Sequence, residues 1–228
     1  MFTGNTQYRR VMTTIAIIGG HGKIGLLATQ ELAAAGHTVL SVIRNPDHVS
    51  DVVAAGATAV VLDIETATGS ELATSINGAE AVIFTAGAGG GSGAARKETV
   101  DHQGAVKSMA AAGELGIERF VQVSYIGADD ASYGTEDPSF AAYQRAKAAA
   151  DDALRASTLA WTIVRPGTLN DQARTGLVTI DGSLTSGETS RANVASVLAV
   201  LAVEKLAIGQ VLNVIDGDTE VRSAILGA

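Results

Sequence analysis

The sequence predicts an α/β fold in which a single doubly wound parallel sheet carries helices on both faces. Strand-like and helix-like patterns alternate along the 228 residues, as in repeated strand–helix–strand units. Several strand-like runs are largely apolar rather than alternating, among them IAII, AVVL and FVQV, which is typical of strands covered on both faces. A glycine-rich turn joins the first strand pattern to the first helix pattern.

The elements follow one another in a regular order. Strands are expected at Thr14–Ile18, Thr38–Arg44, Ala59–Asp63, Ala81–Thr85, Arg119–Ser124, Trp161–Arg165 and Gln210–Ile215. Helices are expected between them, at Ile24–Ala35, Pro46–Ala55, Gly69–Ile76, Arg96–Leu115, Phe140–Ser157 and Arg191–Leu201. No linker divides the chain, because the glycine-rich segment Ala86–Arg96 falls between a strand and a helix, where we expect a loop beside a ligand.

Length and composition suggest one domain at residues 13–228, with small C-terminal elements on the substrate side. Residues 1–12 are expected to form a flexible lead-in, because they lack the apolar core of a signal peptide and Met12 directly precedes the first strand. Hydrophobic residues make up 46% of the chain and charged residues 18%, as in a globular protein with a well-buried centre.

The composition also narrows the partners. A net charge of -8 argues against nucleic acid or an anionic membrane, and no apolar run is long enough to cross a bilayer. The chain has no cysteine, which excludes disulfides and thiolate chemistry and fits a cytoplasmic protein. Its four histidines are scattered, so no metal site is predicted. We expect a small-molecule substrate and a monomer or small homo-oligomer.

The turn after the first strand, GGHGKIG, is the first candidate binding site. Gly19, Gly22 and Gly25 are three residues apart between a strand and a helix, which suits the approach of a dinucleotide pyrophosphate to the backbone. The helix that follows offers unpaired N–H groups and a partial positive charge to an anion. His21, Lys23 and Ile24 belong to the same loop and are expected to contact the cofactor. The alternative is a glycine-rich turn with no ligand.

Arg44 ends the second strand, at the position where dinucleotide-binding folds distinguish their cofactors. An acid there would bind the ribose hydroxyls of NAD, whereas an arginine can pair with a 2′-phosphate. We therefore expect NADP(H) to be preferred, with NAD(H) as the alternative. Arg44 could also be a solvated strand end, and Asp47 lies close to it in the sequence.

The ends of the third and fourth strands add further candidates. Asp63 can accept a hydrogen bond from an adenine amino group, and the Ile64 N–H can donate to a ring nitrogen; alternatively Asp63 caps a turn. Ala86 and Gly87 are small enough to let a cofactor lie against the backbone.

Three residues could carry chemistry beside a nicotinamide. Ser124 ends the fifth strand, and Tyr143 and Lys147 are four residues apart on the helix that follows. A lysine ammonium lowers the pKa of a nearby phenol, so Tyr143 could pass a proton while Ser124 binds the substrate carbonyl. The alternative is a surface aromatic beside a solvated lysine.

The sixth strand runs into a break at Pro166 and Gly167. The backbone from Gly167 to Leu169 is expected to face the nicotinamide, whereas Arg165 is expected to be a structural ion-pair partner.

Taken together, these motifs resemble those of the short-chain dehydrogenase/reductase (SDR) superfamily, and most closely its atypical, NmrA-like and small NADPH-binding reductase branch. The resemblance rests on GGHGKIG, on the segments at residues 100–128, 143–169 and 189–202, and on GQVLNVIDG. It implies a Rossmann fold that binds the cofactor through Gly19, Gly22, Gly25, Arg44, Asp63, Lys147 and the backbone around Gly167. It also implies the Ser–Tyr–Lys roles for Ser124, Tyr143 and Lys147, although the helical Asn of that superfamily is not evident near Gln103.

Two functions are consistent with these residues. The first is an NADPH-dependent reductase of a small carbonyl or quinone-like compound, with Tyr143 as proton donor and Lys147 on the ribose. The second is a non-enzymatic NADP(H) sensor of the NmrA-like type that acts through a protein partner. A nucleotide-sugar epimerase is less favoured, because roughly 60 residues after Leu169 are few for a substrate domain.

Overall fold

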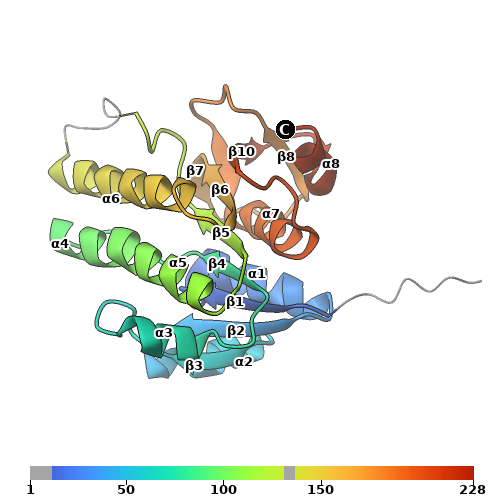
Figure 1. Cartoon of the computed structure of the whole chain (residues 1–228). Helices are drawn as coiled ribbons and strands as arrows, with labels where there is room; N and C mark the ends of the chain where they lie inside the picture. Colours follow the sequence, from blue (N-terminus) through green and yellow to red (C-terminus); the bar gives the residue numbers. More distant parts are fainter. Residues whose placement is uncertain (1–11, 131–136) are drawn as a thin grey trace, which may run out of the picture.

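A computed structural model describes residues 12–130 and 137–228, so most of the expected lead-in at residues 1–12 lies outside the described part. Within that part a nine-stranded, mostly parallel sheet lies between two layers of helices (Figure 1). Its order is β11-β8-β10-β6-β5-β4-β1-β2-β3. The run β3-β2-β1-β4-β5-β6 is that of a Rossmann fold, and it confirms the predicted fold class.

Seven strands of the sheet correspond to the expected ones, with ends that differ by up to two residues. They are β1 (Thr14–Ile18), β2 (Thr38–Ile43), β3 (Thr58–Val61), β4 (Ala81–Phe84), β5 (Arg119–Val123), β6 (Ala160–Pro166) and β10 (Gln210–Asp216), and they run parallel. Because neighbouring strands are parallel, their carboxyl ends meet at one edge of the sheet.

Short C-terminal strands complete the structure and were not predicted. β8 (Leu177–Ile180) is antiparallel both to β10 and to β11 (Thr219–Glu220). β7 (Thr168–Asn170) and β9 (Glu188–Ser190) form a separate parallel pair above the edge of the main sheet. These strands have two to four residues and mixed polarity, so they give no apolar run to recognise.

The helices divide between the two faces of the sheet. One face carries α1 (Lys23–Ala34), α2 (Val49–Ala54), which follows the short turn η1 (Pro46–His48), α7 (Arg191–Glu204) and α8 (Val221–Leu226). The other carries α3 (Gly69–Ser75), α5 (Ala105–Glu114) and α6 (Pro138–Arg155). The predicted helix at residues 96–115 is instead three segments: α4 (Ala94–Arg96), a π-helical stretch η2 (Lys97–Gly104) and α5.

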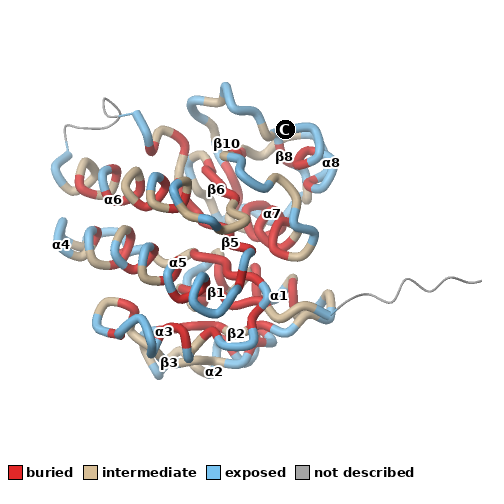
Figure 2. The backbone as a smooth tube through the Cα atoms, in the orientation of Figure 1, coloured by how far each residue is buried: buried red, intermediate tan, exposed pale blue. Residues whose placement is uncertain are grey.

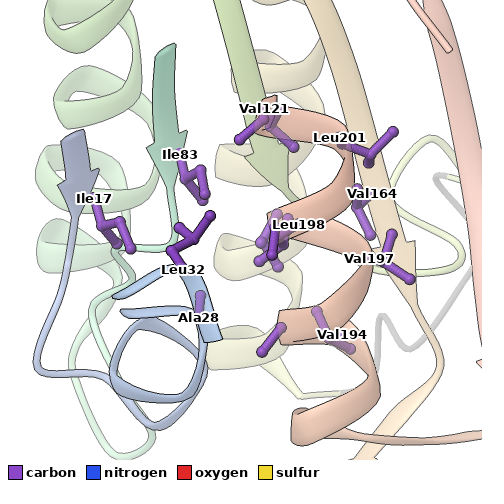
Figure 3. Close-up of a cluster of buried hydrophobic side chains, with 14 of the residues drawn as sticks. Ile17, Ala28, Leu32, Ile83, Val121, Val164, Val194, Val197, Leu198 and Leu201 are labelled. Atoms are coloured by element: carbon purple, nitrogen blue, oxygen red, sulfur yellow. The ribbon is translucent and has the colours of Figure 1, made fainter. Parts of the chain in front are cut away.

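The core is apolar on both sides of the sheet, and the strands and α7 are its most buried parts (Figure 2). Leu32 of α1 and Leu198 of α7 pack with Ile83 and Val121 of the central strands (Figure 3). Arg119 is fully buried beside this cluster, where its guanidinium donates hydrogen bonds to the carbonyls of Leu201, Ala160 and Leu206. It thereby satisfies carbonyl groups at and beyond the end of α7. No helix of the described residues has the length and apolar character needed to cross a membrane.

Candidate functional site

The phosphate loop between β1 and α1 has the close packing that its glycines predict. Gly19 has a φ of +88°, and a Cβ at this position would lie 2.6 Å from the backbone of Ala86. A Cβ on Gly25 would lie 2.7 Å from the Gly19 carbonyl oxygen. Gly22 is the N-cap residue of α1 and has no side chain with which to cap the first turn. The helix N-terminus is therefore free to bind an anion, as a dinucleotide pyrophosphate requires.

A groove of about 280 Å³ runs from this loop across the carboxyl ends of the neighbouring strands. Its lining includes eight predicted cofactor contacts, namely Gly19, His21, Gly22, Arg44, Asp63, Ile64, Ala86 and Gly87. The groove lies where β1 and β4 are neighbours, which is the point at which the chain order of the sheet reverses. Open α/β sheets bind dinucleotides at this place, so the residues present fit such a cofactor.

Arg44 lies at the open end of the groove, half exposed, with its Nη1 atom 3.5 Å from Glu65 Oε2. Glu65 has stronger partners, because Arg96 Nε donates to it at 2.9 Å and Thr99 Oγ1 at 2.7 Å. Burial alone would raise the pKa of Glu65, but these two hydrogen bonds and the charges of Arg96 and Arg44 lower it below its usual value. Glu65 is therefore held as an anion by Arg96 and Thr99, which leaves the Arg44 guanidinium loosely engaged.

Asp63 both closes a turn and lines the groove, and Ile64 packs beside it. Asp63 Oδ1 accepts a hydrogen bond from the Glu65 N–H at 3.0 Å, so the side chain closes a turn while it lines the groove. Ile64 is buried, and its Cδ1 atom would lie 2.9 Å from a Cβ placed on Gly104 of η2. Ile64 thus links the end of the groove near Arg44 to the helix beside the second pocket.

Two further residues of the phosphate loop make contacts that were not predicted. The His21 ring stacks on His48 with 3.5 Å between ring centroids, and His21 Nε2 lies 3.0 Å from Asp51 Oδ2. Lys23 is exposed and its Nζ is 2.5 Å from Asp171 Oδ2. Lys23 therefore ties the phosphate loop to the segment after β7, and it is not among the residues that line the groove.

A second pocket of about 440 Å³ continues from the groove, with which it shares Thr85, Ala86 and Gly87. It brings together the three predicted catalytic residues and two predicted cofactor contacts, namely Ser124, Tyr143, Lys147, Ile24 and Leu169. Residues from β5, α6, the phosphate loop and β7 therefore meet in one place. Because the pocket joins the groove, a ligand lying in one would reach the other.

Lys147 is buried in this pocket and is held by two groups. Its Nζ donates to the Val123 carbonyl at 2.7 Å and lies 3.7 Å from Asp101 Oδ1. Asp101, on η2, is itself fully buried, and its other oxygen accepts from the Ala88 N–H at 2.9 Å. The positive charge of Lys147 is therefore balanced by a buried carboxylate of the same pocket.

This pairing contradicts the expectation that Lys147 lowers the pKa of Tyr143. Burial raises the pKa of the Tyr143 phenol well above its ordinary value, and the negative charges of Asp101 and Asp151 raise it further. A phenolate would be poorly solvated there and would face two carboxylates. Tyr143 is therefore a neutral phenol across the physiological pH range.

The Ser124 hydroxyl, which lines the second pocket, is bonded to a buried carboxylate. It donates to Asp151 Oδ2 at 2.9 Å. Asp151 is fully buried; Arg165 Nη2 donates to the same oxygen at 2.9 Å, and Gln122 Nε2 donates to the other oxygen at 2.7 Å. In this conformation the Ser124 proton is donated within the protein, and its bond to a substrate carbonyl stays a prediction. The predicted ion-pair role of Arg165 is confirmed.

Pro166 and Gly167 are not among the residues that line either pocket. The Gly167 N–H donates to the Val214 carbonyl and to Thr189 Oγ1, both at 3.0 Å. A Cβ on Gly167 would overlap the Gly187 carbonyl oxygen at 2.3 Å. A glycine is therefore required at this position by the close approach of Gly187, the residue before β9, and a contact of this backbone with a nicotinamide stays a prediction.

Three charged residues were not predicted from the sequence: Lys97 and Asp101, which line the second pocket, and Asp151, which accepts from Ser124 of that pocket. Asp151 follows Lys147 by four residues on α6, so its helical spacing could have revealed it. Lys97 and Asp101 have the same spacing, but they lie on the π-helical stretch, whose irregular turn gives no sequence signal. The described residues contain no group of three acidic or histidine side chains placed to hold a metal ion.

The fold, the phosphate loop and the groove together define a Rossmann-fold dinucleotide-binding protein. Residues 19–205 match a family described as NAD(P)H-binding, and the chain belongs to that family. The glycine loop and both pockets lie within this matched range.

Similar proteins include a Bacillus subtilis protein, YhfK, named an uncharacterized sugar epimerase. It is 34% identical over 212 residues, which cover 92% of this chain and 98% of the relative. A solved structure from Bacillus halodurans, named for an NAD-dependent epimerase/dehydratase, has 32% identity and a TM-score of 0.87. It covers 95% of this chain and 100% of its own. ChuY from Escherichia coli O157:H7, described as an anaerobillin reductase, has 25% identity and a TM-score of 0.76, and covers 91% and 99%. The chain is thus an NAD(P)H-binding protein, and it is similar to proteins named as epimerases and as a reductase.

Proposed function

We propose that the protein is an NADPH-dependent reductase of a small carbonyl or quinone-like compound. The observation that carries the proposal is the position of Tyr143 and Lys147 in a pocket continuous with the dinucleotide groove. A ligand along the groove would end beside both side chains. The names of the relatives divide between epimerases and a reductase, so the direction of proton transfer is the property that separates the two activities.

The state of Tyr143 favours reduction. A neutral phenol can donate a proton to the oxygen of a carbonyl as that oxygen gains negative charge. Oxidation of an alcohol, the first step of many epimerisations, would instead need a phenolate base, which burial, Asp101 and Asp151 disfavour. When bound, reduced nicotinamide supplies the hydride that the carbonyl carbon accepts. Tyr143 supplies the proton and regains one from water.

In this proposal Lys147 positions the cofactor, and Asp101 positions Lys147. An ammonium has three N–H donors, and Lys147 uses one on the Val123 carbonyl. A second faces Asp101, which leaves a donor for the ribose hydroxyls of the cofactor. Asp101 holds the lysine at the depth where both contacts are within reach.

The preference for NADPH over NADH rests on Arg44. Its guanidinium is half exposed at the rim of the groove, and its partner Glu65 is bound more tightly by Arg96. A 2′-phosphate brings more negative charge and three oxygen acceptors, so it competes well for Arg44. His48 lines the same end of the groove.

Thermal unfolding in the presence of NADPH or NADH, at equal concentration, tests cofactor binding. A ligand that binds only the folded protein raises its stability by RT ln(1 + [L]/Kd), so the tighter cofactor gives the larger shift. We expect a larger shift with NADPH. A larger shift with NADH would overturn the role of Arg44, and no shift with either would overturn the cofactor itself.

Oxidation of NADPH in the presence of a panel of aldehydes, ketones and quinones tests the reaction. Turnover that depends on Tyr143 supports the reductase. Turnover that Tyr143→Phe leaves unchanged would contradict the assigned proton donor, and exchange of a sugar stereocentre without net NADPH oxidation would favour an epimerase.

A further inference from the structure

Lys97 is a buried cation that the proposed reaction does not use. It is the first residue of η2, and only 7% of its surface is exposed. It lines the second pocket together with Tyr143, Ser124 and Lys147. Its Nζ lies 5.4 Å from the centroid of the Tyr143 ring, so the ammonium is placed beside the proposed proton donor.

Within residues 12–130 and 137–228, the Lys97 ammonium has neither a carboxylate within 4.0 Å nor a hydrogen-bond acceptor. Of the two acids on η2, Glu98 pairs with His102, and Asp101 faces Lys147 and the Ala88 N–H. What the ammonium does contact is the face of the Tyr143 ring. Buried lysines are rare unless they are paired, because the loss of hydration is otherwise uncompensated.

Lys97 and Lys147 differ in the groups that surround their ammonium groups. Both lysines are more than nine-tenths buried and line one pocket, but Lys147 has a carbonyl and a carboxylate, whereas Lys97 among the described residues has an aromatic face. A cation held over an aromatic ring keeps its N–H donors available on the other side. Lys97 is therefore ready to bind an anion that enters the pocket.

We propose that Lys97 binds a carboxylate of the substrate, so that the substrate class is a small oxo acid. The inference rests on the proposed reductase function and deepens it. With the carboxylate on Lys97 Nζ, the same small molecule can place its carbonyl oxygen at the Tyr143 hydroxyl. Reduction then converts C=O to CH–OH, with the hydride and its two electrons from NADPH and the proton from Tyr143, while the carboxylate is unchanged.

Matched acids and esters measure this recognition directly. Pyruvate, acetoacetate and levulinate place the carboxylate progressively further from the carbonyl, and their methyl esters remove the charge. We expect at least one acid to exceed its ester in kcat/KM by about tenfold or more, as a charge-assisted hydrogen bond provides. The acid that shows the largest ratio reports the spacing between Lys97 and the reacting carbonyl.

The variant Lys97→Gln should lower that acid-to-ester ratio about tenfold or more, mainly through a higher KM for the acid. Lys97→Arg keeps the charge and should recover part of the ratio. Lys205→Gln, at an exposed position outside the pocket, removes the same charge from the protein and should leave the ratio as it is. The unfolding temperature of each variant confirms that it is folded.

Binding of levulinate and methyl levulinate to the protein with NADP⁺, measured by calorimetry, separates this inference from the reductase proposal. Acid binding that Lys97→Gln abolishes, without turnover of any carbonyl compound, would keep the anion site and overturn the reductase. Turnover with the same acid-to-ester ratio of kcat/KM in the wild type and in Lys97→Gln would support the reductase and overturn the anion site.

Discussion

The two ends of the ligand site are built on different principles. At the end of the groove that we propose for the adenosine of the cofactor, the adenosine end, Arg44 and Glu65 are partly exposed and come from the loops that follow β2 and β3. At the reactive end, Lys97, Asp101 and Lys147 are buried and come from η2 and α6, far apart in the sequence. The charged side chains of the first end are solvated and lie just after strands in the sequence. Those of the second end are desolvated and are brought together by tertiary packing.

This difference sets what a substitution can do at each end. An exposed charge interacts through water, so its loss changes affinity by a modest factor. A buried charge is stabilised by its partners, so its loss leaves another charge unpaired in a medium that solvates it poorly. We therefore expect graded effects at the adenosine end and large effects at the reactive end.

The largest effect is expected for Tyr143→Phe, which removes the proposed proton donor and leaves the ring beside Lys97. Loss of a general acid lowers turnover by about 10²–10⁴-fold. We expect kcat to fall within this range, with an unchanged Kd for NADPH measured by fluorescence titration. A loss of NADPH affinity as large as the fall in kcat would show that Tyr143 contributes to cofactor binding as well.

The next largest effect is expected for Asp151→Ala, which should lower the free energy of unfolding rather than turnover. It leaves the buried Arg165 with Asp129 alone and removes the acceptor of Ser124. Breaking a buried ion pair on one side costs about 3–5 kcal/mol in unfolding free energy, which urea denaturation measures.

Asp152→Ala is the matched control for this change. Asp152 is the next residue of α6, is largely exposed and pairs with Arg155, three residues on. Loss of such a surface pair costs about 0.2–1 kcal/mol. Equal losses for the two variants would contradict the contrast between buried and exposed charges.

The same contrast explains which features the sequence could predict. The phosphate loop, Arg44 and Asp63 each follow directly on an apolar run, so their place at the sheet edge follows from strand order alone. The parallel strands were recognisable for the same reason. Tyr143 and Lys147 share one helix face, and their spacing identified them without tertiary information.

The remaining features depend on packing that no local pattern encodes. The pairing of Asp101 with Lys147 requires the π-helical turn of η2 to bring two elements together. The raised pKa of Tyr143 follows from burial and from the negative charges of Asp101 and Asp151, so the spacing of Tyr143 and Lys147 alone predicts the opposite direction. The close approach of Gly187 to Gly167 likewise depends on tertiary packing that the local sequence does not show.

A smaller effect is expected for Arg44→Gln at the adenosine end. Because Arg44 is half exposed, the loss of its bond to a 2′-phosphate should weaken NADPH binding by about tenfold, or about 1.4 kcal/mol. Its affinity for NADH should change less, since NADH lacks that phosphate. Calorimetric titration measures both constants, and Arg145→Gln, an exposed change on α6, should alter neither. A parallel loss for both cofactors would place Arg44 away from the phosphate.

The smallest effect is confined to alkaline pH and tests the electrostatics of the reactive end. Because the pKa of Tyr143 is raised in the folded protein, the unfolded chain loses this proton first, from about pH 10 upward. The folded state then binds more protons than the unfolded state, so this group makes stability fall as the pH rises above that point. Below about pH 9 it contributes no slope.

Arg119 acts in the opposite direction over the same range, because burial lowers its pKa to about 10 and the unfolded chain keeps the proton longer. The difference in urea midpoint between the wild type and Tyr143→Phe removes this shared contribution. We expect that difference to be constant up to about pH 9 and then to shift in favour of Tyr143→Phe. A difference that stays constant to alkaline pH would mean that the Tyr143 phenol ionises as freely as in water, and the buried carboxylates would then not set its charge.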